Sequence, residues 1–218
     1  MKNNKILRLL ILCTTIALIS LTALQGQSII QETSEISVDK NLLESYVGRY
    51  DYGRGMVLIV TLEDNQLYAQ ISGQSMFPIF PSSKDQFFWK EVDANVTFNV
   101  DEKGDVTHVI HHQNGGQFEA KRLPDETPVV VDPAVFHKYV GKYEAGNNNI
   151  IVISIEGDKL YAQGLNLPRY QLLPASETEY FLWEINARAM FKANDNGRTD
   201  TILINFNGVE STAIRLKE

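Results

Sequence analysis

Two groups of residues have the types and spacing that some catalytic or metal sites use. Ser37 and Lys40 stand three apart, as the nucleophile and its lysine partner do in one class of serine acyl-transfer hydrolases. That chemistry needs a buried helix start and partner motifs in a large α/β domain, and no such domain follows Ser37. A four-residue pattern recurs by chance. The sequence therefore predicts no catalytic residue.

The second group is the histidine cluster His108, His111 and His112. A metal site needs ligands that converge on one point. On a strand, His111 would face away from the other two, and those two would lie about 13 Å apart. We therefore predict one half-buried histidine, two surface histidines and no metal site.

The elements that must position these residues occur twice in the chain. Tyr46-Val47-Gly48-Arg49-Tyr50 returns as Tyr139-Val140-Gly141-Lys142-Tyr143, and Leu67-Tyr68-Ala69-Gln70 returns as Leu160-Tyr161-Ala162-Gln163. At this constant offset of 93, residues 46–123 align with 139–216 without a gap and 22 of 78 positions are identical. Self-similarity of this kind indicates two copies of one module. The residues of the second copy equivalent to the three histidines are Thr201, Ile204 and Asn205. The fold therefore does not depend on histidine at these positions.

Each copy opens with a short helix pattern. Asp39 can cap a helix that has Leu42, Leu43 and Tyr46 on one face. In the second copy, Asp132-Pro133 places proline at the first helical position, and Phe136 and Tyr139 then share a face.

Short strand patterns separated by turn residues follow each helix. Asn114-Gly115, matched by Asn207-Gly208, is the strongest of the hairpin signals, because a type I′ turn needs positive φ at both central residues. Such closely spaced strands predict an all-β antiparallel sandwich or closed barrel. In the first copy the strands are expected at 47–53, 56–63, 66–72, 76–81, 86–90, 95–100, 105–112 and 116–122.

Comparison of the copies assigns faces to some strands. Leu58, Val60 and Leu62 match three isoleucines, so they are expected to point inward. Phe98 and Val100, with their counterparts Phe191 and Ala193, are expected on an inward face too.

The aromatic residues allow two interpretations. An eight-stranded interior is wide enough for side chains or for one small ligand. In the first interpretation the aromatic residues fill the cores, namely Tyr50, Tyr143, Phe88, Phe181, Trp89 and Trp183. In the second, some line a cavity, with tyrosine hydroxyls as its polar groups. The cavity candidates are Tyr50, Tyr68, Phe98, Tyr143, Tyr161 and Phe191.

The N-terminus predicts export. Lys2, Lys5 and Arg8 precede an apolar run from Leu9 to Leu24, which is typical of a signal peptide cleaved near residue 26. An uncleaved membrane anchor is the alternative. We expect a signal peptide at 1–26, a flexible leader at 27–38, repeats at 39–123 and 132–218, and a proline-bearing linker at 124–131.

Composition narrows the possible partners. The 192 residues that remain after cleavage (218 − 26) include no cysteine, so core packing alone must hold the exported protein together. The net charge of −7 becomes about −10 without the three leader cations, which argues against nucleic acid or an anionic membrane as a partner. Membrane contact would come only through an uncleaved signal segment. No cofactor is expected.

With the repeat in view, the chain resembles the lipocalin-like C-terminal domain found behind penicillin-binding and class C β-lactamase-like serine hydrolases. The resemblance is carried by Tyr46/Gly48/Tyr50, Leu67-Tyr68-Ala69, Phe80-Pro81, Phe87-Phe88 and Phe98/Asp101/Gly104, and by Tyr139/Gly141/Tyr143, Leu160-Tyr161-Ala162, Leu173-Pro174, Tyr180-Phe181 and Phe191/Asn194/Gly197. It implies two tandem small antiparallel lipocalin-like β-barrels. It also implies that the chemistry belongs to a hydrolase domain that these motifs do not include.

The expected function is therefore that of a non-catalytic accessory or binding module, exported to the periplasm or secreted. Its partner would be a protein such as an envelope serine hydrolase, or a second copy of the chain. The alternative is a lipocalin-like carrier of a small, partly apolar ligand. One larger barrel built from strands of both copies is the rival to two separate barrels.

Overall fold

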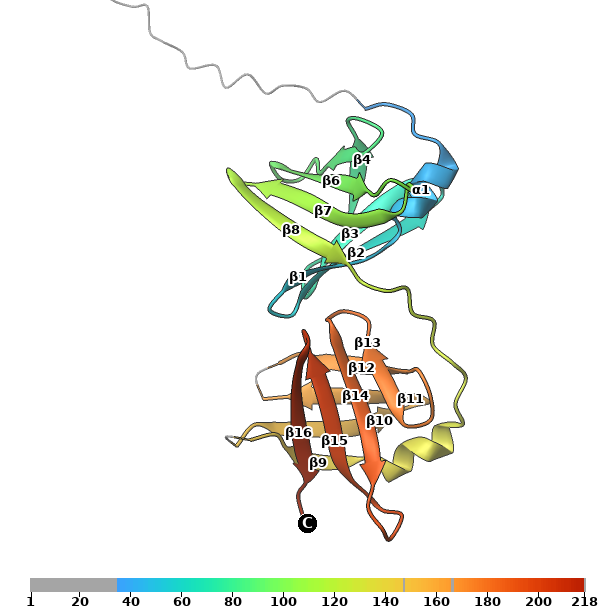
Figure 1. Ribbon diagram of the computed structural model, residues 1–218, viewed down its shortest axis with the longest axis vertical. Coiled ribbons are helices and arrows are strands. Elements are labelled where there is room, and N and C mark those ends of the chain that lie inside the picture. Colours follow the sequence, from blue (N-terminus) through green and yellow to red (C-terminus); the bar gives the residue numbers. More distant parts are fainter. Residues whose placement is uncertain (1–34, 147, 166, 218) are drawn as a thin grey trace, which may run out of the picture. The chain divides into compact units, whose positions relative to one another are not determined.

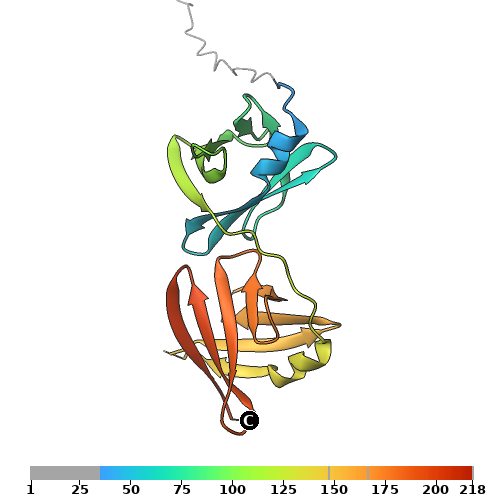
Figure 2. The ribbon, with the colours of Figure 1, turned by 45° about the vertical axis from the view of Figure 1, so that its right-hand side comes forward.

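The first repeat forms a closed barrel of eight antiparallel strands, paired in sequence order and sealed by β1 against β8. The computed structural model describes residues 35–146, 148–165 and 167–217. Both views show the strands wrapping around their own interior (Figure 1, Figure 2). The elements are α1 (Lys40–Tyr46), β1 (Gly48–Gly53), β2 (Met56–Glu63), β3 (Gln66–Ile71), β4 (Phe77–Pro81), β5 (Gln86–Phe88), β6 (Ala94–Val100), β7 (Val106–Gln113) and β8 (Gly116–Arg122).

The second repeat forms its own closed barrel, sealed by β16 against β9. The alternative, one larger barrel built from strands of both copies, is therefore wrong. The predicted pair of all-β barrels is confirmed. The elements are the 3₁₀ helix η1 (Pro133–Lys138), β9 (Gly141–Glu144), β10 (Ile150–Glu156), β11 (Lys159–Gly164), β12 (Arg169–Pro174), β13 (Glu179–Leu182), β14 (Ala187–Ala193), β15 (Thr199–Phe206) and β16 (Val209–Arg215).

The predicted caps and hairpin turns are present. The Asp39 carboxylate accepts a hydrogen bond from the backbone N–H of Asn41, and the Asp132 carboxylate accepts one from Ala134. The hairpin residues Asn114 and Gly115 have φ of 51° and 75°, as the type I′ prediction requires.

The repeated Tyr-x-Gly-x-Tyr motif builds the corner between helix and first strand. In the first barrel the Tyr50 hydroxyl donates to the Tyr46 carbonyl at 2.7 Å, and the Tyr46 hydroxyl donates to the Lys84 carbonyl at 2.9 Å. Arg122 donates to the carbonyls of Ser45 and Val47 at 2.8 and 2.9 Å. These bonds satisfy carbonyl groups that the end of a helix leaves unpaired.

The second barrel repeats this corner with the equivalent residues. The Tyr143 hydroxyl donates to the Tyr139 carbonyl at 2.8 Å, and Arg215 donates to the carbonyls of Lys138 and Val140. The motif that carries the family resemblance is therefore a structural device, used once in each barrel.

Each barrel has its own core. In the first, Tyr46 stacks on Phe98 with ring centroids 4.2 Å apart, and in the second Tyr139 stacks on Phe191 at 4.1 Å. The predicted inward face is confirmed, since Leu58 and Val60 are buried in the first core and Leu62 packs against it.

Two predictions about faces are wrong. Val100 is 52% exposed, and its counterpart Ala193 is exposed as well, because β6 and β14 shift register at these last residues. Two of the aromatic residues expected in the cores lie outside them. Phe88 is half-buried on the outer face of β5, because its neighbour Phe87 points into the first core, and Trp183, which follows β13, is half-buried as well. Phe181 is buried as expected, with 1% exposure.

Candidate functional site

Four of the six cavity candidates lie in the packed cores. Tyr50 and Tyr143 have no exposed surface, Phe98 is 2% exposed and Phe191 is 3% exposed. Both tyrosine hydroxyls donate to backbone carbonyls of the helix corner, so neither is free for a ligand. These four residues fill the middle of each barrel.

The other two candidates lie on outer faces. Leu67 and Ala69 point into the first core, so Tyr68 between them points outward. In the second barrel the Arg169 guanidinium lies over the Tyr161 ring, 4.3 Å from its centroid. Tyr68 and Tyr161 therefore do not lie in the barrel interiors with the other four candidates. Ligand binding by any of the six residues remains a prediction.

Ser37 and Lys40 line the same surface hollow, but among the described residues no hydrogen bond joins them. Ser37 is exposed, and the Lys40 ammonium pairs with Glu44 at 3.5 Å. An activated nucleophile needs its base within hydrogen-bond reach. Within the described residues there is also no group of three or more histidine, cysteine or acidic side chains that could hold a metal ion.

The histidines alternate as predicted, but His111 is more deeply buried than expected. It is 5% exposed, whereas His108 and His112 are partly exposed on the other face of β7. Its Nδ1 lies 3.0 Å from the Tyr52 hydroxyl, and its Nε2 has no hydrogen-bond partner among the described residues. A buried unpaired polar atom is costly and needs an explanation.

Aromatic rings surround this imidazole. The centroid of the Trp89 ring lies 5.3 Å from that of the imidazole, and the centroid of the Phe118 ring lies 6.3 Å from it. Trp89 is 9% exposed, while Phe118 is 51% exposed. We call His111, Tyr52, Trp89 and Phe118 the His111 cluster.

Burial sets the protonation of this cluster. It lowers the pKa of His111, helped by the charge of His112, and it raises the pKa of Tyr52 far above the ordinary value. At neutral pH both groups are therefore neutral, and the hydrogen bond between them can run in either direction.

The sequence contains a signal for this cluster that alternation along single strands does not reveal. At the constant offset of 93, the second repeat has Ala145 for Tyr52, Leu182 for Trp89 and Ile204 for His111. These three apolar residues pack in or against the second core. These three positions carry polar or aromatic side chains in the first copy and apolar ones in the second. The fold therefore does not require the side chains of the His111 cluster.

A second feature that the sequence did not predict centres on Glu126 of the linker. The described residues belong to one compact unit, which runs from Ser34 to Glu218. Within it, Glu126 pairs with Arg49 at 2.8 Å and with Arg188 at 2.6 Å. Arg49 is only 4% exposed; it also donates to the Leu182 carbonyl at 3.0 Å and lies 4.8 Å from the Trp183 ring centroid.

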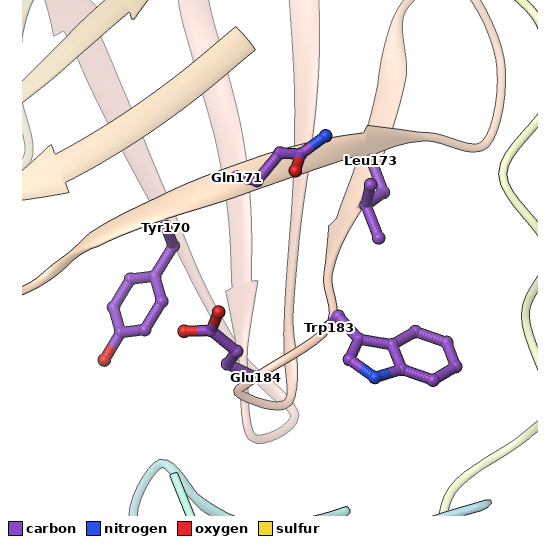
Figure 3. Close-up of a pocket in the computed structure, with 5 residues that line it drawn as sticks. All are labelled: Tyr170, Gln171, Leu173, Trp183 and Glu184. Carbon is purple, nitrogen blue, oxygen red and sulfur yellow. The ribbon is translucent and has the colours of Figure 1, made fainter. Parts of the chain in front are cut away.

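A surface hollow of about 250 Å³ lies beside β12 of the second barrel. Figure 3 shows Tyr170 and Glu184 on one side of it and Leu173 and Trp183 on the other, with Gln171 between them. Burial, and then the charge of Glu184, raise the pKa of Tyr170. The hollow offers hydrogen-bonding groups without a nucleophile and base pair.

None of the helices in the described part of the chain has both the length and the apolar character needed to cross a membrane.

Fold and site together define a tandem-repeat protein of two aromatic-cored barrels. The chain belongs to the family described as "Domain of unknown function (DUF3471)", which matches it twice, at residues 32–123 and 125–214.

One curated relative is penicillin-binding protein 4* of Bacillus subtilis (strain 168), 31% identical over 86 residues. The match covers 39% of this chain and only 19% of that protein. Among solved structures, the β subunit of DNA polymerase III from Thermotoga maritima aligns with 81% of this chain and 60% of its own, at 10% identity and a TM-score of 0.13. A score that low carries no structural argument.

Proposed function

We propose that this chain is an exported, non-catalytic accessory module that acts through a protein partner in the cell envelope. The partner class that the relative suggests is a serine hydrolase of the penicillin-binding type, because 86 residues of this chain resemble part of such a protein. Self-association is the other arrangement that this proposal admits.

The observation that carries the proposal is the filled interior of both barrels. The stacked pairs Tyr46–Phe98 and Tyr139–Phe191 occupy equivalent central positions in the two cores. Their ring centroids are 4.2 and 4.1 Å apart, respectively. A carrier would need an enclosed space of some hundreds of Å³ lined by a few polar groups. With the middle of each barrel filled, neither barrel has the large central space that a carrier needs, which favours recognition of a protein at the outer surface.

The outer surface offers apolar contacts. Large apolar side chains exposed to 40% or more are found in both barrels, and such side chains contribute to protein interfaces when they gather. In the first barrel they include Met56, Met76, Phe77, Val92 and Val100. Met76 and Phe77 are adjacent at the start of β4, and we choose them as the surface to test.

Export is part of the proposal and rests on the N-terminal sequence, which lies outside the described residues. Intact-mass measurement on protein from the native host should show loss of about the first 26 residues. A cytoplasmic protein with its N-terminus intact would contradict export.

Partner capture tests the proposal directly. The tagged chain, crosslinked in envelopes of its own host, should enrich a protein that a fluorescent penicillin labels. A variant with Met76→Ser and Phe77→Ser should lose most of that enrichment, whereas Val100→Ser on another part of the barrel should keep it. Native mass spectrometry provides the opposing outcome, because a bound small molecule of constant mass with no protein partner would favour a carrier.

A further inference from the structure

The His111 cluster lies toward one end of the interior of the first barrel, beyond the central stack. Val109 and Ala120 are paired across β7 and β8 and are both buried in the first core. Two residues further toward the β7–β8 turn, His111 is paired directly with Phe118. Directly paired residues project from the same face of a sheet, so both side chains lie on the interior face.

The cluster places a buried polar atom beside an exposed aromatic ring. The Nε2 atom of His111 is buried and unpaired, while the adjacent Phe118 ring is 51% exposed. A ligand that reaches the imidazole would have to displace the Phe118 side chain, and a side-chain rotation breaks no strand pairing. The other walls, Tyr52 and Trp89, are fixed more firmly, because Tyr52 bonds to Nδ1 and Trp89 is 9% exposed.

The second repeat shows that the barrel does not need these residues. Ile204 and Ser211 are paired in β15 and β16 as His111 and Phe118 are in β7 and β8. Ile204 packs against the second core and has no polar side-chain atom to satisfy. The first repeat therefore carries a buried polar atom that the same barrel can omit.

We infer that the His111 cluster is a binding site for a small, uncharged cyclic alcohol or phenol, present in the first repeat alone. The rings of Trp89 and Phe118 would contact the apolar body of the ligand, and His111 Nε2 would hydrogen-bond to its hydroxyl group. A hydroxyl both donates and accepts, so it matches either tautomer of the imidazole. An ionic ligand is disfavoured, because none of the four side chains carries a charge at neutral pH.

The test uses phenol as the probe, with toluene as the matched compound that lacks the hydroxyl group. The chain has two tryptophans, so Trp183 in the second barrel serves as an internal reference for Trp89. In nitrogen-15 NMR spectra, phenol should produce a saturable shift of the Trp89 indole N–H and of the His111 ring nitrogens. The Trp183 signal should not move.

The hydroxyl group should matter. Phenol should bind roughly tenfold more tightly than toluene, since the toluene complex leaves the buried Nε2 unpaired. His111→Ile, which copies the second repeat, should bring the two affinities level. Tyr52→Ala, Trp89→Leu and His111→Ile combined should abolish binding at this place, with the far-ultraviolet circular dichroism unchanged.

Three results would overturn the inference. They are the absence of a saturable shift at Trp89 up to the solubility limit of phenol, equal affinities for phenol and toluene in the unmodified chain, and equal shifts at Trp89 and Trp183. All three are measured on the unmodified chain, so the test does not depend on whether a variant folds.

Discussion

Gly48 and Gly141 show how single residues set the corner of each barrel. Both have φ of 153°, and a Cβ placed on them would lie 3.3 Å from the Arg122 guanidinium and 2.8 Å from that of Arg215, respectively. Glycine is needed here for two reasons, backbone conformation and the close approach of the arginine. The arginine in turn bonds to the carbonyls at the end of the helix.

We predict that Gly48→Ala lowers the free energy of unfolding by about 2–4 kcal/mol, because the strained backbone and the displaced Arg122 add their costs. Urea denaturation followed by circular dichroism measures this loss. Gly53→Ala is the control, since Gly53 also has positive φ (80°) but nothing within 4 Å of the added Cβ. Equal losses in the two variants would contradict the role given to Arg122.

His111 predicts an acid sensitivity that is confined to the first barrel. Burial lowers its pKa in the folded state below the ordinary value of 6.5, so the unfolded chain takes up the proton more readily. The stability from the neutral ring is complete above pH 6.5 and is lost as the pH falls from 6.5 toward the folded-state pKa. His111→Ile should remove this part of the pH dependence.

Urea midpoints of the unmodified chain and of His111→Ile, compared at pH 7.5 and pH 5, test this prediction. Between pH 7.5 and pH 5, the urea midpoint of the unmodified chain should fall relative to that of His111→Ile. His108→Thr, which copies the second repeat at a partly exposed position on the other face of β7, is the matched control variant. A variant difference that does not change with pH would contradict the assignment.

At the scale of elements, the linker is a structural part of the molecule. Glu126 is 16% exposed and bonds to Arg49, whose side chain is 4% exposed. Removing one partner of a buried pair leaves the other charge uncompensated, which costs more than the pair itself contributed. Arg188 shares the same carboxylate from β14.

Glu126→Gln should therefore destabilise the chain by roughly 2–4 kcal/mol, below the full range for a buried pair because Glu126 keeps some exposure. Differential scanning calorimetry measures the change. The neighbouring Asp125, whose side chain is 77% exposed in its pair with Arg122, provides the control. Asp125→Asn should change stability by less than about 0.5 kcal/mol, and an equal effect of the two variants would show that Arg49 does not depend on Glu126.

At the scale of the whole molecule, each repeat has what a domain needs to fold by itself. Each barrel closes its own hydrogen-bond ladder and packs its own core. Closure leaves no unpaired strand edge. The linker contacts add to this arrangement and are not part of either ladder.

We predict that residues 132–218 expressed alone unfold cooperatively and give a β-type circular dichroism spectrum. The fragment should melt at a lower temperature than the full chain, because it lacks Arg49 and Glu126. A longer fragment, residues 124–218, includes the linker and should recover only the part of the melting temperature that Glu126 contributes. An unfolded 132–218 fragment would show that the barrels are not independent domains.

The sequence by itself determined the local structure and the repetition. The offset of 93 predicted two copies of one module, and asparagine-glycine pairs such as Asn114-Gly115 placed hairpins where positive φ is found. All eight expected strands of the first repeat are present, with ends that differ by at most two residues. These features depend on turn chemistry and on alternation between neighbours, which act within a few residues.

Only the tertiary structure decided which distant side chains meet. Tyr52 and His111 are 59 residues apart and are joined by closure of the barrel, while Arg49 is buried through contacts with the linker and with Leu182. The outward position of Val100 likewise follows from a register shift between β6 and β7. Alternation along a strand says which side chains share a face, but strand pairing, register and closure decide which of them lie within reach of one another.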